Sequence, residues 1–136
     1  MVNRSTMRQL AALSLLALSG CAGVSCPDGL KPGIATTLYF GAARRGAPDV
    51  SEAEWRAFLA DTAGRRLPGL TVTEGLGLFR EPDGTPASER TKVVVTAHHG
   101  HAEEVQAIAE VVDAYKRRFD QWGVGRIDQP ACTDFD

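Results

Sequence analysis

Three histidines lie close together in the chain, and histidine is a common metal ligand: His98, His99 and His101. His98 or His99 with His101, plus Glu103 or Glu104, could bind zinc or copper. His98 and His99 alternate at the end of an expected strand, however, so their side chains point to opposite faces. Structural zinc needs four ligands, and catalytic zinc usually takes three from the protein. We therefore expect a solvated polar turn, with no metal and no cofactor.

A second chemical signal is Leu18-Ser19-Gly20-Cys21, at the end of an apolar run near the N-terminus. It resembles the lipobox of bacterial lipoprotein signal peptides. Arg4 and Arg8 precede the run Leu10 to Leu18, which is far shorter than the roughly 20 residues of a membrane-spanning helix. A basic start, a short apolar run and small residues before the cut are typical of a cleaved secretory signal. The pattern predicts lipidation of Cys21; the alternatives are an ordinary signal peptide or a buried core helix.

The lipobox divides the chain into three parts. Residues 1–20 are a signal peptide that is cleaved, residues 21–32 a short tether and residues 33–136 a single α+β domain. By resemblance to other lipoproteins, Cys21 carries a diacylglyceryl group and an N-acyl chain such as palmitate, and two or more chains anchor a protein stably. The expected location is the cell envelope, with the membrane as a partner. Because Ala22 rather than an aspartate follows Cys21, the outer membrane is favoured if the source is Gram-negative.

The charge balance excludes one class of partner. Loss of Arg4 and Arg8 with the signal leaves 13 of the 15 basic residues against 17 acidic ones. A mildly acidic chain without a basic stripe argues against binding to nucleic acid.

The cysteine count fits an exported protein. Once Cys21 is assigned to lipid, Cys26 and Cys132 remain as a pair, one near each end of the domain. Disulfides persist in an oxidising compartment, so we expect a Cys26–Cys132 bridge. Two free thiols or an intermolecular bond are the alternatives.

Hydrophobic periodicity predicts six elements. Strands are expected over 34–41, 70–80, 91–98 and 124–128, with a bulge or bend at Gly75 and Gly77, and helices over 51–64 and 101–121. Ser51 and Glu54 form a capping box that starts the first helix, and Gly123 is the expected cap after the second. The order is that of the ferredoxin-like βαββαβ fold, an α+β fold with a four-stranded antiparallel sheet and two helices on one face.

This topology suggests two candidate sites. We expect the C-terminal ends of the first and third strands to meet where both helices begin, and helix N-termini favour anions. A weak anion site would then gather Arg44, Arg45, His98, His99 and His101; exposed loops with incidental charge are the alternative.

The second candidate is the sheet face that the helices leave open, which commonly serves as a partner or ligand surface. Strand alternation is expected to place there Thr37, Tyr39, Val94, Thr96, His98 and Arg126. Tyr39, His98 and Arg126 could form a small enzyme site. A homodimer interface or a solvated face is the alternative, on grounds of fold analogy.

Several segments, in the same order, resemble a family of small exported bacterial proteins known only as a domain of unknown function, DUF3574. They are 37–41, 51–59, 69–72, 92–95, 114–119 and 130–132, and the resemblance covers Cys26 to the C-terminus. The resemblance implies no activity. One departure is His98-His99-Gly100-His101, where the family would have a histidine followed by a proline or an acidic residue.

Taken together, the sequence favours a lipid-anchored cell-envelope protein that acts as a binding or association module. The alternative is a small-molecule enzyme that uses the open sheet face or the loops bearing arginine and histidine.

Overall fold

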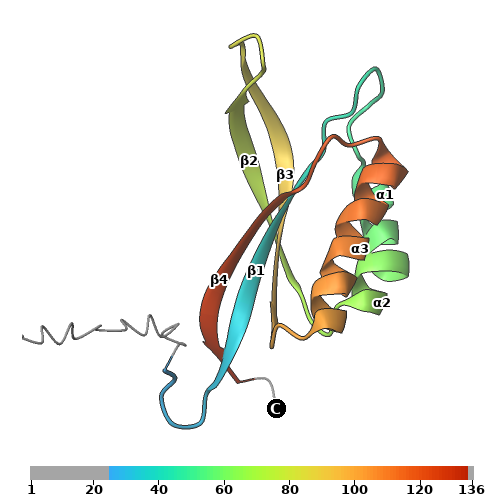
Figure 1. The fold of residues 1–136 in the computed structure, drawn as a ribbon. Coiled ribbons are helices and arrows are strands. Elements are labelled where there is room, and N and C mark those ends of the chain that lie inside the picture. The colour runs from blue at the N-terminus through green and yellow to red at the C-terminus, as the bar shows by residue number, and fades with distance from the viewer. Residues whose placement is uncertain (1–24, 135–136) are drawn as a thin grey trace, which may run out of the picture.

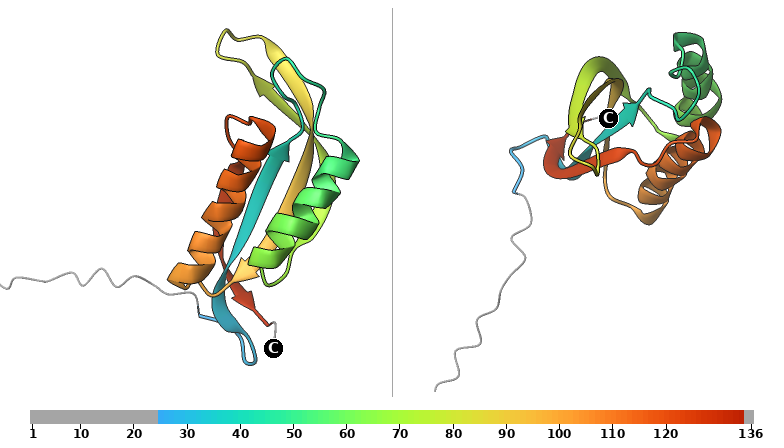
Figure 2. Two further views of the ribbon diagram at one scale, coloured as in Figure 1. Left: turned by 90° about the vertical axis from the view of Figure 1, so that its right-hand side faces the viewer. Right: turned by 90° about the horizontal axis from the view of Figure 1, so that it is seen from above.

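The computed structural model describes residues 25–134, so Cys21 and the expected signal peptide lie outside the described residues. Its elements are β1 (Lys31–Gly41), α1 (Glu52–Phe58), the π-helical turn η1 (Leu59–Ala63), α2 (Gly64–Arg66), β2 (Thr71–Arg80), β3 (Pro86–His98), α3 (Ala102–Phe119) and β4 (Gly125–Thr133). The strands form one antiparallel sheet in the order β2-β3-β1-β4. The helices lie together on one side of it (Figures 1 and 2). The ferredoxin-like α+β prediction is confirmed.

The first helix begins where its capping box predicts. The Glu54 backbone N–H donates to Ser51 Oγ at 3.2 Å, and the Ser51 backbone N–H donates to Glu54 Oε2 at 2.8 Å. Two donors that a helix start leaves unpaired are thereby satisfied. Val50 and Trp55, on either side of the cap, are both buried.

The helical segment then departs from the expected spacing. Leu59 to Ala63 form a π-helical turn, which accommodates one extra residue in the helix. The buried face therefore shifts by one position, so that Ala63 is buried while Thr62 is only half-buried. The segment runs on to Arg66, two residues beyond the expected end.

The hairpin of β2 and β3 is longer than predicted. β3 begins at Pro86, and the pairing continues to Arg80 opposite Pro86, so half of the expected 81–90 loop is strand. Of the expected bulge or bend at Gly75 and Gly77, the bulge is wrong, because the register is continuous through both residues. A Cβ at Gly77 would lie 2.9 Å from the Thr91 hydroxyl, so this glycine makes room for a neighbouring side chain.

The end of the chain also differs from prediction. α3 is capped by Asp120 in the left-handed conformation, with φ 51°, rather than by Gly123. β4 runs past Asp128 and through Pro130 to Thr133. A proline is tolerated there because β4 is an edge strand, and a missing N–H costs no ladder bond on the free side.

The expected disulfide is formed between Cys26 and Cys132, whose Cα atoms are 5.6 Å apart. The two halves meet because Pro32 at the start of β1 pairs with Cys132 near the end of β4. The bridge closes a loop of 106 residues. In the chain-entropy model, such a loop is worth up to about 4–5 kcal/mol of stability.

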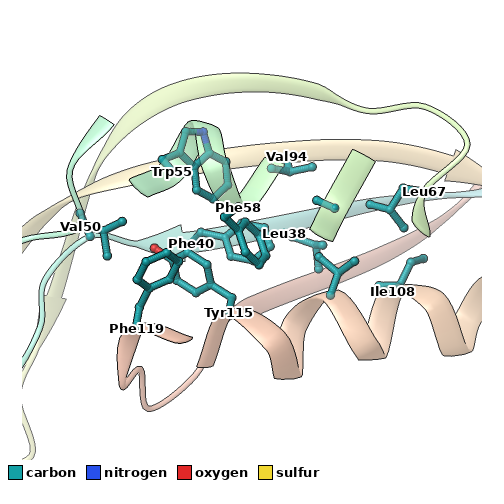
Figure 3. Close-up of a cluster of buried hydrophobic side chains, with 13 residues drawn as sticks. Leu38, Phe40, Val50, Trp55, Phe58, Leu67, Val94, Ile108, Tyr115 and Phe119 are labelled. Carbon is teal, nitrogen blue, oxygen red and sulfur yellow. The ribbon is translucent and has the colours of Figure 1, made fainter. Parts of the chain in front are cut away.

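The core is an aromatic cluster between the sheet and the helices (Figure 3). Phe40 of β1 lies 4.7 Å from the ring of Tyr115 and 5.4 Å from that of Trp55, measured between centroids. Phe58 lies 5.2 Å from Tyr115, completing a chain of tilted and edge-to-face contacts. The Tyr115 hydroxyl donates to the Gly41 carbonyl at 2.8 Å, so the one polar atom of this ring is satisfied. Burial raises the pKa of that phenol.

Candidate functional site

The residues of the expected anion site lie at opposite ends of the molecule. β1 and β3 are antiparallel, so Ile34 pairs with His98 at one end and Gly41 with Thr91 at the other. Arg44 and Arg45 follow β1 at the second end, whereas His98, His99 and His101 lie at the first, where β3 ends. The two groups do not share a site. The prediction was wrong about strand direction. In an antiparallel pair, the C-terminal ends of the two strands lie at opposite ends of the sheet, so those of β1 and β3 cannot meet.

The exposed histidines belong to the turn that starts α3. His99 and His101 lie with ring centroids 5.9 Å apart. The Glu104 carboxylate accepts the backbone N–H groups of both, at 3.1 Å and 2.8 Å, which holds the turn closed. Burial raises the pKa of the Glu104 carboxyl, but the hydrogen bonds from these amides together outweigh it and hold this pKa below its usual value. Within residues 25–134, no three His, Cys, Asp or Glu side chains gather closely enough to hold a metal ion.

His98 is different, because it is buried and belongs to a polar network beneath the helices. Its Nδ1 accepts the Gly100 backbone N–H at 3.1 Å, and its Nε2 therefore donates to Thr36 Oγ1 at 3.0 Å. The Thr36 hydroxyl in turn donates to Asp128 Oδ1 at 2.6 Å. Arg126 completes the network with its Nε 3.0 Å from the same oxygen. The Arg126 hydrogen bonds, and then that of Thr36, lower the pKa of Asp128.

This network links two members of the expected enzyme site, His98 and Arg126. It does so through Thr36 and Asp128, and on the helix-covered face rather than on the open one. Thr36 is fully buried, and both ring nitrogens of His98 are engaged. His98 also lines a cavity of about 430 Å³ between the end of α2 and the start of α3, but it has no free nitrogen to offer a ligand there. The buried part of the network, His98 and Thr36, therefore has no free group for a ligand, and its role is to satisfy buried polar groups, whereas Asp128 and Arg126 are exposed.

Thr36 and Asp128 were not identified from the sequence. The signal that would have found them is the strand register, since Ile34, two residues before Thr36, pairs with His98, and Thr36 itself pairs with Asp128. Residues two apart in a strand share a face, so the three side chains meet.

The open sheet face also differs from prediction. Directly paired residues share a face, and Thr37 and Tyr39 pair with Val95 and Val93. The predicted members Thr37 and Tyr39 are therefore correctly placed. The other predicted members lie on the helix-covered face: Val94, Thr96, His98 and Arg126. The pairing of Thr36 with Thr96 and of Leu38 with both Val94 and Arg126 places them there. Tyr39 is thus separated by the sheet from His98 and Arg126.

The central part of the face that the helices leave bare, here called the open face, has an unusual composition. It consists of Gly33, Ala35, Thr37 and Tyr39 of β1; Thr91, Val93, Val95 and Ala97 of β3; Thr71, Thr73 and Gly75 of β2; and Gly125, Ile127, Gln129 and Ala131 of β4. None of these side chains is charged. Strand alternation puts the nearest charges on this side, Lys31 and Glu89, beyond its two ends. The charged side chains of the central stretch, Glu74, Lys92, Arg126 and Asp128, lie on the helix-covered face instead.

At the opposite end from the histidines, the loop after β1 is tightly held. The Arg44 guanidinium donates to Glu54 at 3.1 Å and to the Pro48 and Asp49 carbonyls. Hydrogen bonds from the Ser51 backbone and hydroxyl, and then from Arg44, lower the pKa of Glu54 to about 2. Arg45 stacks on Trp122, with its guanidinium carbon 3.7 Å from the ring centroid. Each arginine is thus already engaged by the protein.

These features define a ferredoxin-like α+β domain with an uncharged open face, a partly buried polar network and a held arginine loop. The chain belongs to the family described as protein of unknown function, DUF3574, whose model matches residues 35–135. No curated protein matches the sequence. In the part of the chain that is described, no helix is long and apolar enough to cross a membrane.

Two solved structures share the fold. A phage SAM lyase in complex with S-methyl-5'-thioadenosine has a TM-score of 0.58 and 14% identity, over 75% of this chain and 85% of that chain. The same TM-score and identity apply to a phage SAM lyase in the apo state, over 82% of this chain and 90% of that one. At this identity the likeness concerns the fold alone.

The polar network generates a stability prediction. Thr36→Val keeps the side-chain volume but leaves the buried His98 Nε2–H without its acceptor, and it removes one donor to Asp128, which keeps those of Arg126. We expect a loss of about 1–3 kcal/mol in the free energy of unfolding, measured by urea titration. Thr37→Val is the matched control on the open face and should change this free energy by less than about 0.5 kcal/mol. Equal effects of the two substitutions would contradict the role assigned to Thr36.

Proposed function

We propose that this protein is a lipid-anchored module of the cell envelope that acts by association, and that its open face pairs with a second copy of the chain. The observation that carries the proposal is the uncharged composition of that face. A sheet face exposed to water ordinarily alternates to polar and charged residues. Here the charges of the central stretch are on the covered side, which is the arrangement expected if the bare side is also covered in the working protein.

The apolar side chains of the open face are contiguous. Tyr39, Val95 and Ile127 remain 39%, 42% and 48% exposed, although they come from three adjacent strands. Thr37 pairs with both Val95 and Ile127, so it joins them into one patch. Contiguous exposed apolar surface is typical of an interaction site.

A second copy is the occupant that fits this face best. Two-fold pairing buries the same patch on both partners, and no charge of the patch would have to leave water, which is the principal cost of burying polar surfaces. The small residues Ala35 and Ala97, paired at the centre of the sheet, allow close approach. The rival interpretation, a solvated face, does not account for the absence of charge.

The self-association proposal is tested by placing one charge in the patch. Val95→Lys should weaken dimerisation of the full chain at least tenfold, because the ammonium would have to be buried without a partner. The measurement is sedimentation equilibrium in density-matched detergent. Val105→Lys is the matched control, since Val105 is 38% exposed on the opposite layer, in α3. A wild-type chain that stays monomeric, or two variants that behave alike, would contradict the proposal.

The anchor is proposed on the sequence pattern around Cys21, and the fold adds an orientation. Four residues separate Cys21 from Cys26, so the attachment reaches roughly 17 Å from the disulfide at about 3.3 Å per residue. The disulfide end, with the start of β1 and the histidine turn, would then face the membrane. The arginine loop would then lie at the far end, whereas the histidines would lie at the membrane end.

The anchor is tested by Cys21→Ser. Without the thiol that accepts the diacylglyceryl group, we expect the chain to lose its lipid and to leave the membrane fraction. Mass spectrometry of the N-terminal peptide and fractionation of cells that express the chain measure both effects. Cys26→Ser serves as the control, since it removes a cysteine five residues away and should leave the lipid in place. Lipid-free wild-type protein would refute the anchor.

A second candidate function is a small-molecule enzyme. The fold separates the residues of both sites first considered for it, and the reason to test the class is that a phage SAM lyase has the same fold. Incubation of the full chain with SAM, followed by mass spectrometry, tests it. If the candidate is right, S-methyl-5'-thioadenosine appears faster than with heat-unfolded protein; equal rates would exclude this activity.

A further inference from the structure

A cleft of about 370 Å³ lies at the end of the molecule farthest from the disulfide. Three segments form its walls: the loop after β1, the β2–β3 hairpin and the turn between α3 and β4, which converge at the top of Figure 1. Its volume falls within the range of small-ligand sites. None of its lining residues is among those that define the open face, although Glu89 lies just beyond that face on the same side of the sheet.

Two aromatic side chains line this cleft and remain unusually exposed. Trp122 is 68% exposed and Phe79 is 43% exposed. The aromatic residues of the core, by contrast, are all less than 4% exposed. Leaving two large rings in water forgoes a substantial hydrophobic gain for each. Within a cleft, such rings offer faces on which a flat group can stack.

The protein itself shows what kind of group Trp122 accepts. The Arg45 guanidinium lies 3.7 Å from the centroid of its ring. A guanidinium is flat and positively charged, and the negative face of an indole attracts such a group. A flat heteroaromatic cation combines the same two properties with a larger stacking area.

The charges of the cleft favour a cation. Glu81, Glu89 and Asp120 line it, and none of the three forms an ion pair within residues 25–134. Of the two arginines that line it, Arg44 is already paired with Glu54 outside the cleft. Arg45 balances one of the three carboxylates, so the cleft retains an excess of negative charge.

One of these carboxylates is held in place by the backbone. Glu89 Oε2 accepts the Ala43 N–H at 3.1 Å. A Cβ at position 41 would collide with the Glu89 carboxylate, so Gly41 leaves the room that this carboxylate occupies. The position of the Glu89 carboxylate is thus determined by β1 as well as by β3.

We propose that this cleft binds a flat, positively charged heteroaromatic ring, stacked on Trp122 and Phe79 and neutralised by Glu81, Glu89 and Asp120. The ligand class is that of a cationic nucleobase. The cleft opens at the end away from the anchored disulfide, where a soluble ligand has access.

The probe is 1-methyladenosine, whose ring is cationic at neutral pH, and calorimetric titration of the full chain measures its binding. Adenosine supplies the same ring without the charge, and adenosine monophosphate supplies it with negative charge. We expect affinity to fall in that order. Glu81→Gln should narrow the difference between 1-methyladenosine and adenosine, whereas Glu103→Gln, at the opposite end of the molecule, should not.

The stacking residues are tested separately. Trp122→Ala and Phe79→Ala should each weaken 1-methyladenosine binding about tenfold or more, and Trp122→Phe should restore part of the loss. Leu78→Ala removes an exposed apolar side chain next to Phe79 on the same strand, outside the cleft, and should have no effect. All three positions are exposed, and circular dichroism confirms folding. Absence of millimolar binding, binding that is indifferent to Trp122, or tighter binding of the monophosphate would overturn the proposal.

Discussion

The structure depends on the packing of one aromatic cluster against one face of the sheet. Phe40 of β1 contacts Trp55 from the first helical segment and Tyr115 from α3, so a single strand position holds both helices. The Tyr115 hydroxyl bond to Gly41 fixes the height of α3 along the strand. Because these large rings occupy the same side, both helices must lie there. The other side of the sheet is consequently left to water or to a partner, and its uncharged composition accords with that division.

The antiparallel sheet also separates the candidate functional groups between its two ends. β1 is central and antiparallel to both of its neighbours, so the loop after β1 lies at the opposite end from the turn after β3. One end carries the disulfide, the histidine turn and the network of His98, Thr36 and Asp128. The other carries the arginine loop and the aromatic cleft. If the lipid anchor is attached near Cys26, the first end is tied to the membrane, and the chemistry available to a soluble ligand lies at the second.

Local signals in the sequence were accurate where a few neighbouring residues decide the structure. The Ser51 and Glu54 capping box placed the helix start, because both hydrogen bonds are made within one turn. Signals were less accurate where distant segments decide. The hairpin was predicted too short, because its outer residues are strand only through their hydrogen bonds to the opposite strand. Their own sequence shows no alternation of polar and apolar residues. The π-helical turn at 59–63, which buries Ala63, was missed because the expected buried face followed regular helical spacing.

By itself, the sequence determined the order of elements, the ferredoxin-like class, the family and the pairing of Cys26 with Cys132, because alternation, capping and cysteine parity are properties of short segments or of counts. Only the tertiary structure decided which residues meet. Strand register brought Thr36 to His98 and Asp128, and strand direction set the histidines apart from Arg44. Strand register also placed Tyr39 and His98 on opposite faces. The physical reason is that a shift of one residue in register exchanges the two faces of a strand, and no local propensity records that choice.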